Sequence, residues 1–170
     1  LSAYAIGLRV EDAKATVERA TALGAEVFFE PRGPGELEIP AIRGVGGSVL
    51  YFIDEQSGLS RVWDVEFEPV EQSGPGAGLL HIDHVAQTMN TDEMLSWLLF
   101  YTSIFATRKS PAVDVVDPAG LVRSQVVEGL DRRFRLTLNG AESRRTLAGR
   151  FVAESFGSSV QHLAFSSADI

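Results

Sequence analysis

Two histidines in this 170-residue chain have the type and the spacing of metal ligands. His84 and His162 stand 78 positions apart, and each begins a short strand-like run. A neutral imidazole is a common ligand of iron, zinc and copper. A single histidine is more often structural, but two histidines at matching places favour a shared site. We therefore predict that His84 and His162 are metal ligands.

Strand alternation is expected to place the third histidine, His81, on a different face from His84. Successive side chains of a strand point to opposite faces, so alternation groups His84 with Ile82 and Ala86. His81 and Asp83 are then expected on the other face, and His81 is interpreted as a surface or strand-edge residue.

The same rule gives His162 small neighbours on its own face. Ala164 and Ser166 share that face and leave room for a metal or a ligand. Leu163 and Phe165 are expected on the opposite side, where they can pack beneath a helix.

The two histidine strands belong to a repeat of nearly constant period. Similar segments begin at Ala5, His84 and His162, which lie 79 and 78 positions apart, and each runs toward an acidic residue that can begin a helix. Self-similarity at a fixed period indicates a repeated structural unit. Because Ala5 stands where the other copies have histidine, the first copy is expected to bind no metal.

Each full period predicts a strand, a helix and three further strands. In the first, Asp12 can cap a helix that Gly24 ends, with Ala13, Val17, Ala20 and Leu23 inward. The expected strands that follow cover residues 27–29, 37–42 and 48–53.

In the second period, Thr91 can cap the helix, whose inward residues are Met94, Trp97, Leu98, Tyr101 and Phe105. The expected strands are 80–88, 112–116, 120–127 and 134–139. A short helix is expected within 143–156, with Leu147, Phe151 and Val152 inward.

This pattern predicts an α+β fold of repeated βαβββ modules. The expected parts are a metal-free module over residues 1–70, a linker over 71–79, a second module over 80–142, and a connecting helix and first strand of a third module over 143–170. Leu1 opens the chain close to one strand and Ile170 follows another, so we expect a fragment.

Composition excludes several classes of partner. The net charge is −8 with scattered basic residues, which argues against nucleic acid and anionic membranes. No apolar run is long enough to cross a membrane. The absence of cysteine excludes disulfides and thiolate chemistry, and a cytoplasmic location is expected.

The segments 82–85 (Ile-Asp-His-Val) and 160–164 (Val-Gln-His-Leu-Ala) resemble the catalytic half of 4-hydroxyphenylpyruvate dioxygenases. The resemblance implies the vicinal-oxygen-chelate fold, with open half-barrels and helices on the outer face. It also implies Fe(II), or another divalent metal, held by His84, His162 and a carboxylate expected beyond residue 170. Two histidines and one carboxylate form the facial triad of non-haem iron oxygenases.

Two further segments, 120–124 and 135–139, resemble strands of that family that carry substrate-pocket residues. The resemblance assigns substrate binding to Ser124 and Asn139, and a hydroxyl and an amide could orient a keto acid by hydrogen bonds. A solvated serine and a strand-end asparagine are the alternative. Gln161 is a weaker candidate, and no residue is assigned a catalytic role.

Segments 33–48, 96–101, 117–124 and 138–146 resemble a bacterial subgroup in which a dioxygenase-like part follows a TIM-barrel 3-dehydroshikimate dehydratase. The expected function is a fragment of an iron-dependent oxygenase domain acting on an aromatic 2-oxo acid, inactive by itself. The alternatives are a non-catalytic or regulatory part of a bifunctional dehydratase, and an extradiol dioxygenase or glyoxalase-type enzyme. A small aromatic or keto-acid substrate is expected, and a homo-oligomer is left open.

Overall fold

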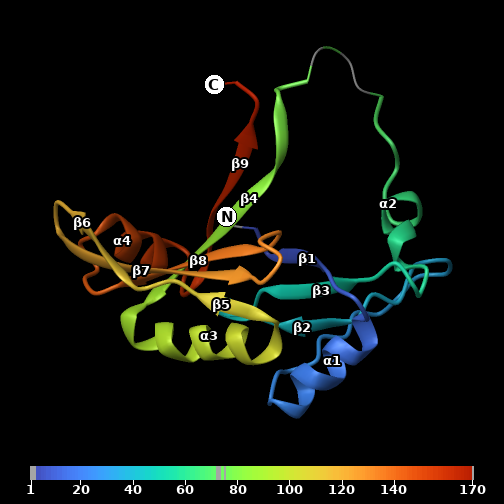
Figure 1. Cartoon of the computed structure of the whole chain (residues 1–170), viewed down its shortest axis with the longest axis horizontal. Helices are drawn as coiled ribbons and strands as arrows, with labels where there is room; N and C mark the ends of the chain where they lie inside the picture. Colours follow the sequence, from blue (N-terminus) through green and yellow to red (C-terminus); the bar gives the residue numbers. More distant parts are fainter. Residues whose placement is uncertain (1–2, 72–73, 75, 170) are drawn as a thin grey trace. The chain divides into compact units, whose positions relative to one another are not determined.

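The computed structural model describes residues 3–71, 74 and 76–169 and divides them into two compact units. The N-terminal unit is Ala5–Gly76. The C-terminal unit contains the described residues from Ala77 onward, together with Ala3 and Tyr4. Each unit has its own sheet (Figure 1).

The N-terminal unit is built on a small sheet in the order β1-β3-β2. β1 runs parallel to β3, and β2 is antiparallel to β3. Its elements are β1 (Ala5–Arg9), α1 (Ala13–Ala22), β2 (Ala41–Arg43), the 3₁₀ turns η1 (Val45–Gly47) and η2 (Leu59–Arg61), β3 (Val49–Ile53) and α2 (Val62–Val65).

The buried carboxylate of Asp54 joins the end of β3 to the start of α1. Its Oδ2 accepts a hydrogen bond from the Ala13 backbone N–H at 2.8 Å, while Asp12 caps the helix by accepting from Ala15 N. Oδ1 also accepts from the N–H groups of Gln56 and Ser57 and from the Ser57 hydroxyl. These bonds satisfy backbone donors at a helix start and in the turn after a strand.

The C-terminal unit is built on a six-stranded sheet in the order β5-β7-β8-β4-β9, with β6 also paired to β7. β4 runs parallel to β8 and antiparallel to β9. Its elements are β4 (Leu79–Asn90), α3 (Thr91–Ile104), β5 (Thr107–Lys109), β6 (Val113–Asp117), β7 (Gly120–Gly129), β8 (Arg135–Ala141), α4 (Leu147–Glu154) and β9 (Ser159–Ser167).

In the N-terminal unit β1 runs parallel to β3, and in the C-terminal unit β4 runs parallel to β8. In each case, the strands between the two in sequence lie further along the sheet. This is the arrangement that a strand–helix–three-strand module produces. The predicted α+β fold of repeated modules is thus confirmed, and neither sheet closes into a barrel within the described residues. The exact module boundaries stay a prediction. The expected linker, residues 71–79, includes residues 72, 73 and 75, which lie outside the described residues.

Helix α3 packs on the sheet face that carries Gln87 and Gly140. The Tyr101 hydroxyl donates to Gln87 Oε1 at 2.8 Å, and both residues are fully buried. A Cβ on Gly140 would lie 3.0 Å from Met94 Sδ, so the helix lies directly against β8. Helix α3 therefore does not cover the opposite face of β4, β8 and β7.

Several element boundaries differ from the sequence prediction. The N-cap of α3 is Asn90, and Thr91 is already helical. Residues 27–29 form no strand but only an isolated bridge between Val27 and Ile42, and β5 was not predicted. Leu23 and Leu147 were expected inward, yet they are 53% and 70% exposed, because each lies at a helix end beyond the buried stripe.

Candidate metal centre

Cross-strand pairing brings His84 and His162 together on one face of the C-terminal sheet. His84 pairs with Ala164 and His162 pairs with Ala86, so the two histidines are diagonal neighbours across β4 and β9. Their ring centroids lie 5.7 Å apart, with the planes at 76°. Diagonal neighbours on adjacent antiparallel strands are close enough for large side chains to meet. We call this face, with its two imidazoles, the histidine face.

A β-bulge at Asp83 changes the face assigned to the neighbouring residues. Ile82 pairs with Phe165 and His84 pairs with Ala164, so Asp83 is an extra residue on β4. In such a bulge, two successive side chains can lie on the same side of the sheet. Asp83 Oδ2 accordingly contacts His84 Nδ1 at 2.8 Å.

The predicted faces of His81, Ile82 and Asp83 were therefore wrong. His81 pairs with Ser166, which alternates with Ala164 and His162 on the unbulged part of β9. The Ser166 hydroxyl lies 2.9 Å from His81 Nδ1, on the same face. His81 is exposed, as expected, but it shares the histidine face because the extra residue reverses the alternation.

Leu163 and Phe165 occupy the opposite face, as alternation predicts, but no helix among the described residues covers them. They pair with Val85 and Ile82, and they remain 42% and 47% exposed. The expected packing beneath a helix is wrong for the described residues, because α3 lies over β4 and β8 while β9 forms the edge of the sheet.

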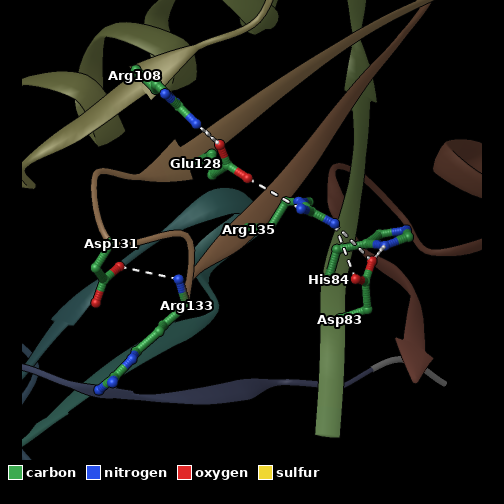
Figure 2. A network of polar contacts seen from close by, with 7 residues as sticks. All are labelled: Asp83, His84, Arg108, Glu128, Asp131, Arg133 and Arg135. Atoms are coloured by element: carbon green, nitrogen blue, oxygen red, sulfur yellow. Dashed lines mark hydrogen bonds and ion pairs between the residues drawn. The ribbon is translucent and has the colours of Figure 1, made fainter. Parts of the chain in front are cut away.

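A chain of charged contacts extends from His84 across the sheet (Figure 2). Arg135 Nη1 lies 3.0 Å from Asp83 Oδ1 and 3.1 Å from Oδ2, so the guanidinium contacts both carboxylate oxygens. Arg135 Nη2 also contacts Glu128 Oε1 at 3.1 Å, and Glu128 Oε2 accepts from Arg108 at 2.6 Å. Both arginines in this chain contact carboxylate oxygens, so their charges are paired with charges of opposite sign.

The charges in the chain favour one protonation pattern. The hydrogen bond with His84 and the charge of Arg135 lower the pKa of Asp83. Hydrogen bonds from Arg108 and Arg135 lower the pKa of Glu128. Both carboxylates are therefore ionised at neutral pH. Burial, and then the charge of His84, lower the pKa of His162, which favours its neutral form.

Ser124 and Asn139, the predicted substrate residues, lie opposite each other on β7 and β8. Asn139 also pairs with Thr88, which alternates with Ala86 and His84 on β4, so both predicted residues lie on the histidine face. Thr88 is four residues from His84, or about 13 Å along the strand. Within the described part of the chain, neither side chain has a hydrogen-bond partner.

Gln161, the weaker candidate, has a structural contact. It is the extra residue of a second bulge, between the pairs Ala86–His162 and Gln87–Val160. Its Oε1 accepts a hydrogen bond from the Thr88 hydroxyl at 2.9 Å. This contact occupies the amide oxygen that a substrate would otherwise use.

The donor set fits two ligands of a metal site. Asp83 engages Nδ1 of His84, which leaves Nε2 as the free ring nitrogen, and a carboxylate partner of this kind commonly orients metal-binding histidines. His162 presents a second imidazole on the same face. The described residues contain no group of three histidine or carboxylate side chains suited to a metal ion.

Sequence reasoning missed the residues behind His84. Asp83 was assigned to the wrong face, and Arg135, Glu128 and Arg108 were given no role. The relevant signal in the sequence is that Asp83 directly precedes His84. Strict alternation, however, would place these two side chains on opposite faces of the sheet. Only the bulge brings them together.

Comparison with known proteins agrees with this fold. Residues 1–68 match the family model described as hydroxyphenylpyruvate dioxygenase, HPPD, N-terminal. Over 169 residues, the chain is 38% identical to a 3-dehydroshikimate dehydratase of Pseudomonas aeruginosa, covering 99% of this chain and 27% of the relative. It is 33% identical to a 4-hydroxyphenylpyruvate dioxygenase of Pseudomonas sp. (strain P.J. 874), covering 99% of this chain and 48% of that enzyme.

Solved structures show the same similarity. A xylose isomerase-like TIM barrel/4-hydroxyphenylpyruvate dioxygenase fusion protein superposes with a TM-score of 0.70 at 33% identity, over 99% of this chain and 26% of that one. A variant of 4-hydroxymandelate synthase from Streptomyces coelicolor gives a TM-score of 0.74 over 96% of this chain and 49% of that one. Its 17% identity shows the fold alone.

The fold is of the vicinal-oxygen-chelate type, which is the fold of these structural neighbours. The chain is similar to 4-hydroxyphenylpyruvate dioxygenases, to 3-dehydroshikimate dehydratases and to a TIM barrel/4-hydroxyphenylpyruvate dioxygenase fusion protein. It spans about a quarter of the dehydratase relatives and about half of the dioxygenases. No described helix is long and apolar enough to span a membrane.

Proposed function

We propose that this chain is part of a non-haem Fe(II) oxygenase domain that acts on an aromatic 2-oxo acid. The observation that carries the proposal is the pair of imidazoles, 5.7 Å apart on one sheet face, with a carboxylate behind His84. His84 and His162 would hold the metal, and a carboxylate outside the described residues would complete the facial triad. Another divalent metal would use the same ligands.

Bound ferrous iron would supply a centre that a 2-oxo acid can chelate and at which dioxygen can react. The chain's own residues would position the substrate. Ser124 and Asn139 present a hydroxyl and an amide on the same face, level with Thr88, which lies about 13 Å along β4 from His84. Such polar groups orient a bound ligand by hydrogen bonds.

A second candidate function is supported by the dehydratase relatives, two of which are 38% and 36% identical to this chain. In that case, the chain would be the dioxygenase-like part of a bifunctional 3-dehydroshikimate dehydratase. The dehydratase reaction would belong to another part of the protein, and the domain described here would be catalytic, or it would act as a non-catalytic ligand-binding or stabilising module.

The test uses the complete protein loaded anaerobically with Fe(II). We expect stoichiometric iron, and oxygen uptake with aromatic 2-oxo acids such as 4-hydroxyphenylpyruvate, but none with catechols. His84→Ala and His162→Ala should each lose iron and oxygen uptake. Phe165→Ala, which truncates a ring on the opposite face of β9, is the matched control and should keep both.

The outcomes separate the candidate functions. Iron binding without oxygen uptake on any aromatic 2-oxo acid would leave the non-catalytic module. Uptake with catechols would indicate extradiol chemistry instead. Failure of His84→Ala and His162→Ala to reduce the iron content would show that the paired histidines are structural. Turnover of 3-dehydroshikimate, measured separately, decides the bifunctional parent.

A further inference from the structure

Asp83 cannot easily serve as the missing metal ligand, although it is the carboxylate next to His84. Its Oδ1 contacts Arg135 at 3.0 Å, and its Oδ2 contacts both Arg135, at 3.1 Å, and His84 Nδ1, at 2.8 Å. Both oxygens therefore already have partners. The guanidinium compensates the negative charge, which weakens the attraction of this carboxylate for a cation.

The geometry gives Asp83 a different task. An ionised carboxylate only accepts hydrogen bonds, so a neutral His84 beside it carries its proton on Nδ1. Nε2 then keeps its lone pair. Asp83 contacts the ring at Nδ1, so Nε2 is the ring nitrogen left for another partner.

The carboxylate itself is held in place from behind. Arg135 contacts Asp83 and Glu128 with its two terminal nitrogens, and Arg108 holds the other oxygen of Glu128 (Figure 2). These residues come from β8, β7 and β5, three consecutive strands of the sheet. The orientation of one ring on β4 is thus coupled to strands across most of the C-terminal unit.

We propose that Asp83 is a positioning residue, held by the chain Arg135–Glu128–Arg108, which fixes His84 in the tautomer whose Nε2 is free to bind a metal ion. The inference rests on the proposed role of His84 as a ligand. It goes beyond that role because it explains the orientation of the His84 ring by residues that do not bind the metal. These are Asp83 in its bulge and the ion pairs behind it.

The experiment uses the 170-residue chain, which has only three histidines, labelled with ¹⁵N in its imidazoles. Long-range ¹H–¹⁵N spectra at about pH 8, where an ordinary histidine is neutral, report the tautomer of each ring. Titration with Zn²⁺, a redox-inert probe, reports the affinity of the paired histidines in the same samples. Circular dichroism confirms that each variant is folded.

In the unsubstituted chain, His84 should show one dominant tautomer, protonated on Nδ1, and weak Zn²⁺ binding that perturbs His84 and His162. Asp83→Asn should give a mixture of tautomers and weaken Zn²⁺ binding about 10- to 100-fold. Arg135→Gln keeps the carboxylate but removes its anchor, so it should change both readouts in the same direction and to a smaller extent.

Asp114→Asn is the matched control. Asp114 pairs with Arg123 on β6 and β7, one position from the pair of Val113 with Ser124, so it lies on the sheet face opposite the histidine face. This substitution removes the same charge from the same unit and should leave the tautomer and the Zn²⁺ affinity unchanged.

An unchanged His84 tautomer in folded Asp83→Asn would overturn the inference, while Zn²⁺ binding by the unsubstituted chain would still support the paired ligands. Complete loss of Zn²⁺ binding in Asp83→Asn with an unchanged tautomer would overturn it too, since it would make Asp83 a ligand. If the unsubstituted chain binds no Zn²⁺ but Asp83→Asn still mixes the tautomers, Asp83 orients the ring of His84, and the iron content of the complete protein decides whether His84 is a ligand.

Discussion

At the residue scale, substitution of the two predicted substrate residues should reduce substrate affinity, whereas substitution of the two predicted metal ligands should reduce metal content. Ser124 and Asn139 face each other across β7 and β8, and their side chains make no hydrogen bond within the described part of the chain. Because these side chains make no hydrogen bond to the sheet, we expect their substitution to affect ligand binding.

We predict that Ser124→Ala and Asn139→Ala each weaken the binding of an aromatic 2-oxo acid to the metal-loaded complete protein. The loss of one hydrogen bond is worth about 0.5–1.5 kcal/mol, which is roughly 2- to 12-fold in affinity. The metal content should not change. Calorimetric titration with the 2-oxo acid, together with metal analysis, measures both quantities, and equal loss of metal in these variants would contradict the assignment.

The buried pair of Tyr101 and Gln87 shows how costly a single polar contact can be. Both residues are fully buried, and burial raises the pKa of the Tyr101 hydroxyl, which keeps it a neutral donor. Gln87 Oε1 accepts from that hydroxyl, whereas Nε2 has no hydrogen-bond partner among the residues that the structure describes. Removal of the hydroxyl would leave the whole amide unsatisfied.

We therefore predict that Tyr101→Phe lowers the free energy of unfolding by about 1–3 kcal/mol. Addition of Gln87→Leu to this variant should recover much of the loss, because both polar partners are then gone. Urea denaturation followed by circular dichroism measures the difference. A cost below about 0.5 kcal/mol would show that water or a shifted side chain satisfies Gln87.

At the element scale, the start of α1 depends on a carboxylate from the end of β3. The hydrogen bonds from the Ser57 hydroxyl, and then from the Ala13 and Ser57 N–H groups, lower the pKa of Asp54 to about 2. The residue itself is 4% exposed. A pKa below the ordinary value of 3.8 means that the folded state favours the ionised form.

The pH dependence follows from this direction. The stabilisation by Asp54 is complete above about pH 4 and is lost as the pH falls through the folded-state value near 2. Asp54→Asn should make the N-terminal unit less stable at pH 7 and flatten its loss of stability between about pH 4 and 2. Thermal unfolding at a series of pH values tests this, and the exposed Asp64, substituted in the same way, is the control.

At the scale of the whole molecule, the described residues form two units with separate sheets and separate buried cores. Phe52, Leu50 and Ile42 are fully or almost fully buried in one, and Leu138, Leu136 and Met89 in the other. A substitution in one core should therefore act first on the strands of its own unit.

We predict that Tyr101→Phe accelerates amide hydrogen exchange in β4 and β8 while leaving β1 and β3 at their original rates. Asp54→Asn should instead accelerate exchange in β1 and β3 and leave β4 and β8 at their original rates. Exchange followed by mass spectrometry of peptides resolves the two units. Equal acceleration in both units for either variant would indicate a single cooperative structure instead.

Much of this organisation can be predicted from the sequence because it depends on local pattern and spacing. The period of 78 and 79 residues, the alternation of strands and the capping residue Asp12 all appear in the linear order, and the structure confirms the α+β modules that they predict. The helix ends and the short strands were less accurate, because packing and cross-strand pairing decide where they stop.

The faces of the residues around His84 were decided by the tertiary structure alone. One extra residue at Asp83 reverses the alternation of β4, so His81 lies on the histidine face and Asp83 reaches His84. Whether a strand has a bulge depends on the register with its neighbour, and a single strand does not contain that information. The same is true of Arg135 and Glu128, which meet Asp83 only because β8 and β7 lie beside β4 in the folded sheet.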